Sequence, residues 1–268
     1  MNLCLRDKKF MPRGRKKQWT KSTDFYINFM NVNQWVIRNG SKLDGFRTEK
    51  LYSRYSFQDA EQVEMGDKAS NTRQRIMSTA EKIILQKGFA GTSIDEVIQQ
   101  SHITKGGFFY HFKGKNDLAL GLLKRYLDAD DVFFNQLLGR ARELTEDPLQ
   151  QMLLFLKLLA EAMAELKVHH PGCLVAAFTY ESQQFDDDVI QMMKDGTLSW
   201  RQLFSEQLCL VEEKYQPRFE TDINDLADML STCLEGGIIL SRILKDPEAL
   251  SKQIIHYRNY LRLLYGDE

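Results

Sequence analysis

The run Thr104-Lys105-Gly106-Gly107 combines residue types that suit contact with a polyanion. A threonine hydroxyl at a helix start caps the helix or donates to a phosphate oxygen, and the backbone N–H groups behind it attract anions. Lys105 adds a positive charge in the first turn. Each glycine costs about 1 kcal/mol in a helix relative to alanine, so two in a row indicate that another surface must come close to this backbone.

Aromatic residues follow the glycines and would anchor the segment. Phe108 and Phe112 are about one helical turn apart, and we expect both in the core rather than in contact with a partner. Tyr110 and His111 lie at the end of the segment, where their polar atoms could reach phosphates. Small residues in front and aromatic anchors behind are typical of a helix that inserts its N-terminal end into a groove of DNA.

Two further groups of residues flank this segment and could bind phosphate. Thr92 and Ser93 precede the apolar stripe of another short helix, and Glu96 stands three residues after Ser93, as in a capping box. Backbone N–H groups at this helix start would face a phosphate in the same way. Lys113 and Lys115 follow the aromatic segment, and we expect them to add phosphate contacts.

The charge distribution agrees with a nucleic-acid partner for the front of the chain. The net charge of all 268 residues is −1, but residues 65–117 hold 8 Lys and Arg against 5 Asp and Glu, and residues 1–64 hold 13 against 7. Residues 118–268 hold 15 against 25. A basic front and an acidic back are expected when only the front meets DNA.

Residues 1–64 lack sustained helical periodicity and are predicted to be a basic, poorly structured extension. Two interpretations stay open. The run Met65-Gly66-Asp67 reads as a fresh start, which would make residues 1–64 an over-extended reading frame. Alternatively, the run from Pro12 to Lys17 is a basic arm that lies in a minor groove.

The sequence offers no residue set for catalysis. It holds no Ser/His/Asp set, no G-x-x-x-x-G-K loop and no paired carboxylates with a clear site, so an enzyme is not expected. No two cysteines have C-x-x-C spacing, and His169, His170 and Cys173 lack an evident fourth ligand, so we predict neither a metal nor a cofactor. No apolar run approaches the roughly 18 residues that span a bilayer, and no secretory signal fits. The expected location is the cytoplasm, without a membrane partner.

From residue 71 onward, apolar residues recur at helical spacing and predict an all-α fold with about nine helices. An N-cap at Asn71 or Thr72 opens the first helix, and Gly88 ends it. Two short helices complete a three-helix, homeodomain-like helix-turn-helix domain over residues 65–117. Further helices are expected at 116 to about 138, 149–166, 173–184, 186 to about 213, 222 to about 244 and 247 to about 265, forming a second domain over residues 118–268.

A run of nearly fifty residues has a distinctive spacing: Arg75-Ile76, Ala80, Phe89, Thr92-Ser93-Ile94-Asp95-Glu96-Val97, Ile103-Thr104-Lys105-Gly106 and Phe112-Lys113-Gly114-Lys115-Asn116-Asp117-Leu118. Over residues 72–118 the chain resembles the DNA-binding domain of the TetR/AcrR family of transcriptional regulators. The resemblance implies a homodimer on double-stranded DNA, with a larger helical domain for ligand binding and dimerisation. Many members have a tyrosine in place of Phe109, which has no hydroxyl for phosphate, and the adjacent Tyr110 is turned by about 100°.

The second domain has no residue-level motif, so its candidate residues are chosen by type. Met and aromatic residues suit an adaptable apolar pocket. The candidate lining residues are Phe155, Leu159, Met163, Cys173, Phe178, Tyr180, Met192, Trp200 and Phe204. Two apolar stripes, Ala227, Leu230, Leu234, Gly237, Ile238 and Ser241, and Leu250, Ile254, Tyr257, Tyr260, Leu261 and Leu264, are the candidate dimer face, with burial inside the protomer as the alternative.

These patterns predict a ligand-responsive dimeric transcriptional regulator. We expect a repressor that binds a palindromic operator and is released by a small apolar effector of unknown identity. The alternative is an activator, or a DNA-binding protein without a small-molecule ligand. Two recognition helices on successive major grooves must lie about 34–36 Å apart, so a ligand that tilts the helix from Asn116 would change operator affinity.

Overall fold

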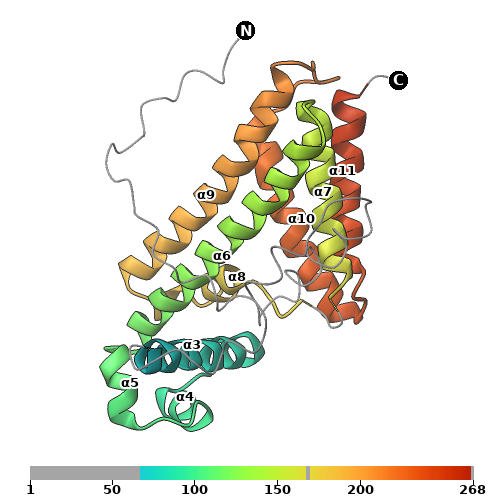
Figure 1. The fold of residues 1–268 in the computed structure, drawn as a ribbon. Helices are drawn as coiled ribbons and strands as arrows, with labels where there is room; N and C mark the ends of the chain where they lie inside the picture. The colour runs from blue at the N-terminus through green and yellow to red at the C-terminus, as the bar shows by residue number, and fades with distance from the viewer. Residues whose placement is uncertain (1–66, 167–169, 267–268) are drawn as a thin grey trace, which may run out of the picture.

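A computed structural model gives the arrangement of residues 67–166 and 170–266. These residues form helices and no strand, so the predicted all-α class is confirmed. The helices of residues 67–111 (α3, α4 and α5) lie at one end of an elongated molecule, and the bundle formed by the other helices extends away from them (Figure 1). No helix in this part of the chain is long and apolar enough to cross a bilayer. The predicted extension over residues 1–64, its basic arm and the Met65 start lie outside the described residues.

The first helix, α3 (Asp67–Lys87), begins before the cap that we predicted at Asn71 or Thr72. A polar residue that can cap the start of a helix can also lie inside the helix. The residues between Asp67 and Asn71 are compatible with a helix, so the helix begins before the predicted cap. Its predicted apolar stripe is buried as expected, at Ile76, Ala80, Ile83 and Ile84. The helix ends at Gly88, which has a left-handed backbone (φ +84°).

Two short helices follow α3, and their predicted caps are confirmed. Ser93 Oγ accepts the N–H of Glu96 at the start of α4 (Ile94–Gln100), at 3.1 Å. Thr104 Oγ1 accepts the N–H of Gly107 at the start of α5 (Lys105–His111), also at 3.1 Å. The tight turn between them contains His102, whose φ is 52°. Residues 67–111 therefore form the predicted helix-turn-helix.

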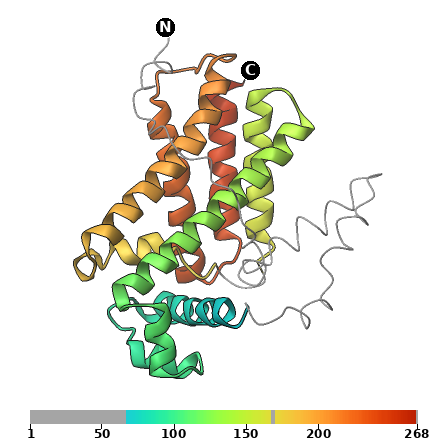
Figure 2. The same cartoon turned by 60° about the vertical axis from the view of Figure 1, so that its left-hand side comes forward.

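The longest helix, α6 (Lys115–Leu144), connects the helix-turn-helix to the bundle (Figures 1 and 2). It extends beyond the end that we predicted near residue 138. Leu137, Leu138 and Ala141 are all buried, so the helix keeps an apolar face for another turn and a half. One rigid element thus crosses the boundary that we predicted between residues 117 and 118.

The bundle is completed by α7 (Pro148–Ala164), α8 (Leu174–Thr179), α9 (Asp187–Glu212), α10 (Ile223–Leu244) and α11 (Ala249–Tyr265). Aspartates 147, 186 and 222 begin three of these helices, because their side chains accept otherwise unpaired backbone N–H groups. The predicted helix over residues 173–184 is shorter than expected. Its last residues form a separate 3₁₀ turn, Ser182–Gln184.

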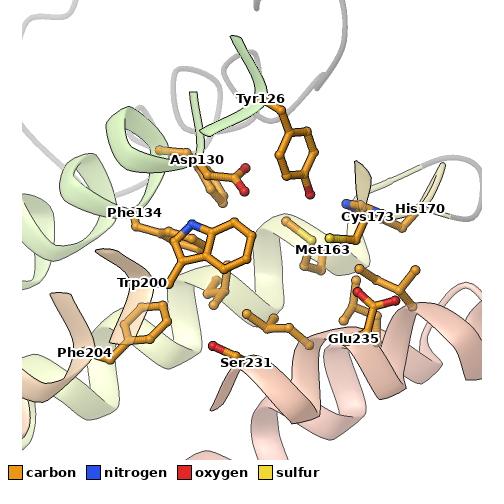
Figure 3. A pocket seen from close by; sticks show the side chains of 15 residues that line it. Tyr126, Asp130, Phe134, Met163, His170, Cys173, Trp200, Phe204, Ser231 and Glu235 are labelled. Atoms are coloured by element: carbon orange, nitrogen blue, oxygen red, sulfur yellow. The ribbon is translucent and has the colours of Figure 1, made fainter. Parts of the chain in front are cut away.

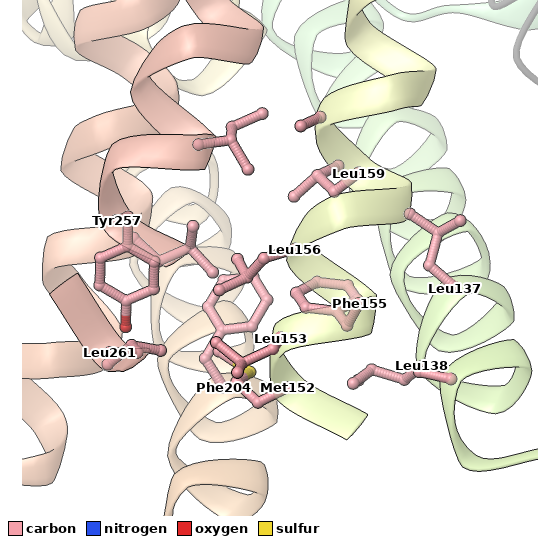
Figure 4. Packing of buried hydrophobic residues seen from close by; sticks show 14 of the residues in the cluster. Leu137, Leu138, Met152, Leu153, Phe155, Leu156, Leu159, Phe204, Tyr257 and Leu261 are labelled. Atoms are coloured by element: carbon pink, nitrogen blue, oxygen red, sulfur yellow. The ribbon is translucent and has the colours of Figure 1, made fainter. Parts of the chain in front are cut away.

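The helices enclose two apolar cores. One fills the bundle, and Phe155 and Phe204 are among its buried residues (Figure 4). The rings of Phe134, Phe155 and Phe204 contact one another there. The other lies where α3, α4 and α5 meet α6, α8 and the start of α9. Phe89 and Phe178 meet edge to face in this second core, with ring centres 5.3 Å apart. The helix-turn-helix therefore shares its core with α8, and a shift of α8 must be accommodated by it.

The predicted dimer stripes face inward, so that prediction is wrong. Its members on α10 and α11 pack mainly against each other and the bundle, and Ala227, Leu230, Gly237, Ile238, Ser241, Leu250, Ile254, Tyr257, Leu261 and Leu264 are buried, while Leu234 and Tyr260 are partly so. The two helices come very close at Gly237, where a Cβ would lie 2.9 Å from Leu250 Cα. Exposed apolar residues lie elsewhere on α10 and α11: Ile239, Leu240, Ile243, Leu244 and Leu263.

Candidate nucleic-acid interface and internal cavity

The short helix α5 buries one face and exposes the other. Phe108 and Phe112 are buried, as predicted. Lys105 and Tyr110 are exposed, and 78% of Tyr110 is accessible. The Lys105 ammonium lies 3.9 Å from the Asp95 carboxylate, and both side chains are largely exposed. Such a pair contributes little in water, so Lys105 can exchange it for another anion.

The two glycines of α5 have different surroundings. A Cβ at Gly107 would lie 3.3 Å from Thr104 Oγ1, so the helix cap favours glycine there. A Cβ at Gly106 would meet no atom within 4 Å. Packing among the described residues therefore does not require a glycine at position 106. Its exposed backbone suits close approach by an external surface, as the sequence predicted.

Thr92 is buried, although the sequence predicts that it lies at the surface and contacts a phosphate. Only 2% of this residue is exposed, its hydroxyl donates to the Gly88 carbonyl at 2.7 Å, and its N–H donates to the Phe89 carbonyl at 3.1 Å. Both donors are used inside the protein, so the predicted phosphate contact of Thr92 is wrong. The neighbouring Ser93 is exposed at the N-terminus of α4 and remains a candidate.

The two lysines after α5 have separate roles. Lys115 Nζ donates to the Phe89 carbonyl oxygen at 2.5 Å and lies 4.2 Å from the centre of the Phe89 ring. Partial burial lowers the pKa of Lys115, opposed by the nearby Glu181 carboxylate. Lys115 therefore holds the turn after α3, and the predicted phosphate contact is not supported. Lys113 is exposed, while its backbone N–H donates to Asp117 at 2.8 Å.

The polar side chains at the end of α5 differ in charge and in exposure, and therefore in how well they could bind a phosphate. His111 is partly buried, and burial followed by the positive charge of Arg73 lowers its pKa. It is therefore mainly neutral at pH 7. Phe109 is 46% exposed, less than Tyr110, so the tyrosine is the outermost aromatic group. Arg73 was missed by the sequence analysis, and its guanidinium carbon lies 4.9 Å from the centre of the Phe112 ring.

A cavity of about 80 Å³ lies inside the bundle (Figure 3). Its wall is mainly apolar and aromatic, with a few polar groups. The aromatic members are Tyr126, Phe133 and Phe134 of α6 and Trp200 and Phe204 of α9. The polar members are Asp130 of α6, His170 and Cys173 before α8, and Ser231 and Glu235 of α10. A concave, mainly apolar site with a few converging polar groups is the usual form of a small-molecule site, and this one is partly open.

Five of the nine predicted lining residues meet at this cavity: Leu159, Met163, Cys173, Trp200 and Phe204. The other four do not line it. Phe155 belongs to the bundle core, and Phe178 and Met192 pack in the core shared with the helix-turn-helix. Tyr180 is 76% exposed at the end of α8, because the chain turns there and places its ring outward.

The cavity residues on α6 were missed, although their spacing carried a signal. Tyr126, Asp130 and Phe134 recur every four residues and therefore share one face of the helix. A carboxylate on a stripe that is otherwise apolar indicates a functional position, since an unpaired buried charge is costly. The α10 members depend on how the bundle closes, which no local pattern revealed.

The titratable groups of the cavity are mostly neutral at pH 7. Burial raises the pKa of Asp130 to about 8, and the nearby Glu81 carboxylate adds to this shift. Burial, with the positive charge of Arg242, lowers the pKa of His170 to about 4. Burial also raises the pKa of Cys173 to about 12, so this residue is a thiol rather than a thiolate.

The short helix α8 links the cavity to the helix-turn-helix. At its start, Cys173 lines the cavity and its Sγ accepts the N–H of Ala176 at 3.4 Å. Just beyond its end, the Glu181 carboxylate accepts the backbone N–H groups of Phe89 and Ala90, at 2.7 and 2.6 Å. Arg242 of α10 adds a bond to a carbonyl oxygen of α3, at 3.3 Å. The turn after α3 is thus held by groups of the bundle.

Comparisons with known proteins agree with this geometry. Residues 76–122 match the family described as "Bacterial regulatory proteins, tetR family". Residues 148–254 match the family described as "Transcriptional regulator LmrA/YxaF-like, C-terminal domain". The two matched segments together span more than half of the chain.

Curated relatives match this chain over most of their own length. The chain is 24% identical to the transcriptional regulator AcuR of Cereibacter sphaeroides over 183 residues, which are 68% of this chain and 81% of that protein. It is 22% identical to the transcriptional repressor NemR of Escherichia coli K12 over 193 residues, 71% and 94% of the two chains. It is 23% identical to the regulator LmrA of Bacillus subtilis over 184 residues, 67% and 91%.

Solved structures show the same fold. The reduced form of E. coli NemR aligns with a TM-score of 0.56 at 21% identity, covering 70% of this chain and 96% of that one. A TetR-family regulator of Agrobacterium tumefaciens aligns with a TM-score of 0.61 at 17% identity, covering 74% and 100%. With both domains matched and the helix-turn-helix in place, the chain belongs to the TetR family of DNA-binding transcriptional regulators.

Proposed function

We propose that the protein is a dimeric repressor that binds a palindromic operator and releases it when a small effector enters the cavity. Residues 65–117 would be the DNA-binding domain, and residues 118–268 would bind the effector and form the dimer. The relatives NemR of Escherichia coli and DhaR of Mycobacterium are named transcriptional repressors, which supports this direction of regulation.

The single observation that carries the proposal is the course of α6. This helix begins at Lys115, directly after the recognition helix α5, and its residues Tyr126, Asp130 and Phe134 line the cavity. Lys115 and Asp130 are roughly 22 Å apart along the helix axis, at 1.5 Å per residue. An effector that displaces α6 at the cavity therefore moves α5 with it. The presence of the cavity favours this function over the alternative without a small-molecule ligand.

The DNA contacts would come from the exposed start of α5 and its flanks. Lys105 and Gly106 would enter the major groove, because both are exposed in the first turn of the recognition helix. Ser93 at the start of α4, Lys113 and Tyr110 would contact phosphates on either side. These contacts set the position on the duplex, and only the first turn of α5 would read bases.

The dimer would form through the outward apolar face of α10 and α11. Ile239, Ile243 and Leu244 on α10 and Leu263 on α11 are between 45% and 76% exposed. The three α10 residues lie near the end of that helix, whereas Leu263 lies at the other end of the helix pair, where the neighbouring Leu264 carbonyl accepts the N–H of Arg218. Exposed apolar residues spread along two neighbouring helices are typical of a subunit interface. Two protomers joined there would form a four-helix interface.

The direct test is selection of duplex DNA from a random pool with the purified full chain. An enriched palindrome whose half-sites are separated by about 10 bp, one helical turn, is expected for a two-fold dimer. Loss of its enrichment with Lys105→Ala, but not with Lys157→Ala on the exposed surface of α7, would assign the contact to α5. If the folded protein enriches no DNA sequence, the proposal is contradicted.

A further inference from the structure

Asp130 is a buried acid for which the described residues provide no partner in the cavity. Only 8% of the residue is exposed, and the described residues offer its carboxyl group no hydrogen bond or ion pair. Figure 3 shows this group pointing into the cavity, between the rings of Tyr126 and Trp200 in that view. A buried carboxyl group is costly unless another group compensates it. Its position therefore indicates a ligand that supplies what the protein does not.

Within residues 67–166 and 170–266, the charged groups near Asp130 provide no counter-ion for it. Glu81 of α3 is a second acid nearby, and Arg125 is already paired with it. Glu235 of α10 also lines the cavity. Burial raises the pKa of Glu235, and the positive charge of Arg242 opposes that shift but does not act on the pKa of Asp130. The other titratable lining groups are Tyr126, His170 and Cys173, while α7 and α9 contribute only the uncharged Leu159, Met163, Trp200 and Phe204. The described wall thus offers two acids and no group that is positively charged at pH 7, because His170 is neutral there.

We propose that the cavity binds a small organic ammonium ion, with Asp130 as its counter-ion and the aromatic wall around its apolar part. This inference rests on the proposed role of the cavity as the effector site and names the class of effector. The faces of Trp, Tyr and Phe attract a cation, so the aromatic wall and the carboxylate favour the same ligand charge. A carboxylate ligand would add a third acid. The cavity of about 80 Å³ is partly open, so a ligand with a single ring can place its ammonium group inside and extend toward the mouth.

Binding of such a ligand must be coupled to a proton. The pKa of Asp130 is about 8, so the carboxyl group is mainly protonated in the empty cavity at pH 7. An ammonium ion favours the ionised form, so binding releases the proton. The affinity should therefore rise with pH, by up to about tenfold per pH unit, until the pH passes the pKa of Asp130.

The experiment compares three ligands of one shape on the purified full chain: benzylamine, benzyl alcohol and benzoate, titrated by calorimetry at pH 6.5, 7.5 and 8.5. Benzylamine should bind at least about tenfold more tightly than benzyl alcohol at pH 7.5, and benzoate should not bind measurably. The benzylamine affinity should increase with pH, and the measured heat should vary with the ionisation enthalpy of the buffer. Equal binding of amine and alcohol at all three pH values would overturn the inference.

Asp130→Asn should remove the preference for benzylamine and its pH dependence. The matched control is Asp131→Asn, which removes the same charge from the next residue of α6, on the exposed face. The control should keep both properties. Unchanged benzylamine binding in folded Asp130→Asn would also overturn the inference. If that variant does not fold, the pH series on the unaltered protein still decides.

These measurements use no DNA, so they separate the inference from the proposed function. A protein that binds benzylamine as expected but no operator would contradict the repressor and leave the cation site standing. An operator released by a neutral compound that fills the cavity, with no binding of benzylamine, would contradict only the cation site.

Discussion

The carboxylate of Glu181, just after α8, accepts the backbone N–H of Phe89 in the turn after α3, with an N···O distance of 2.7 Å. The same carboxylate accepts the N–H of Ala90. Gly88 allows this approach, because a Cβ there would lie 2.5 Å from a Glu181 oxygen. One side chain of the bundle therefore fixes the turn that joins two helices of the DNA-binding unit.

Glu181→Ala should uncouple the cavity from the helix-turn-helix. Loss of the carboxylate leaves two N–H groups without their acceptor, which should cost about 1–3 kcal/mol of stability. A mobile α3–α4 turn should also reduce the change in operator affinity that an effector produces. Thermal unfolding and DNA titration with and without effector measure the two effects. Gln183→Ala, at an exposed neighbour, is the control, and equal behaviour of both variants would refute the role of Glu181.

The three lysines of the interface should behave differently. Lys105→Ala should weaken operator binding more than binding to random duplex, since Lys105 lies in the first turn of α5. Lys113→Ala should weaken both equally and lower the salt slope by roughly one. Lys115→Ala should lower the melting temperature instead, because its ammonium is bonded to the Phe89 carbonyl. DNA titrations at several salt concentrations distinguish these outcomes, and a full salt-slope change for Lys115→Ala would contradict its internal role.

Gly106→Ala should stabilise the protein and weaken DNA binding together. The Cβ has open space, so the substitution should gain up to about 1 kcal/mol of helix stability. The same Cβ would occupy the surface on which the duplex should approach. Chemical unfolding and operator titration measure both changes. Tighter or unchanged operator binding would mean that Gly106 does not face the DNA.

Ile243→Glu should produce a folded monomer that loses most of its operator affinity. Ile243 is 76% exposed on α10, so a charge there should not disturb the protomer but would be buried unpaired in the proposed dimer. Light scattering after size-exclusion chromatography gives the molar mass. Leu210→Glu, at an exposed position on α9, is the control and should remain dimeric. A dimer in both variants would place the interface elsewhere.

Asp130→Asn should stabilise the effector-free protein more at pH 8 than at pH 4.5. The folded-state pKa of Asp130, about 8, is raised above its ordinary value of 3.8. An acid raised in this way favours the folded state at low pH, and that contribution is lost as pH rises from about 4 through 8. The gain should exceed about 1 kcal/mol at pH 8, as measured by unfolding at both pH values. A constant gain would mean that Asp130 does not titrate abnormally.

The helix-turn-helix was predictable because its determinants are local. The caps at Ser93 and Thr104 and the buried Phe108 and Phe112 follow from spacings of three or four residues. Thr92 could not be assigned correctly, since a threonine before a helix can bond inward or outward. Here its hydroxyl turns to the Gly88 carbonyl.

The cavity and the outward face of α10 were only partly predictable, because they depend on contacts between distant segments. Met163 and Trp200 were chosen by residue type and do line the cavity, but Phe178 was chosen on the same basis and packs in the other core. The spacing of the stripe that contains Leu230 predicts a dimer face, but the stripe is buried against the bundle. Periodicity identifies an apolar face but not the surface that covers it.

The most direct test of the proposed repressor is a hydroxyl-radical footprint of the full chain on the enriched duplex. A two-fold dimer should give two equivalent protected regions about 10 bp apart on one side of the helix, and Lys105→Ala should remove both. A single protected region, or a footprint that Lys105→Ala leaves intact, would contradict binding by a dimer through α5.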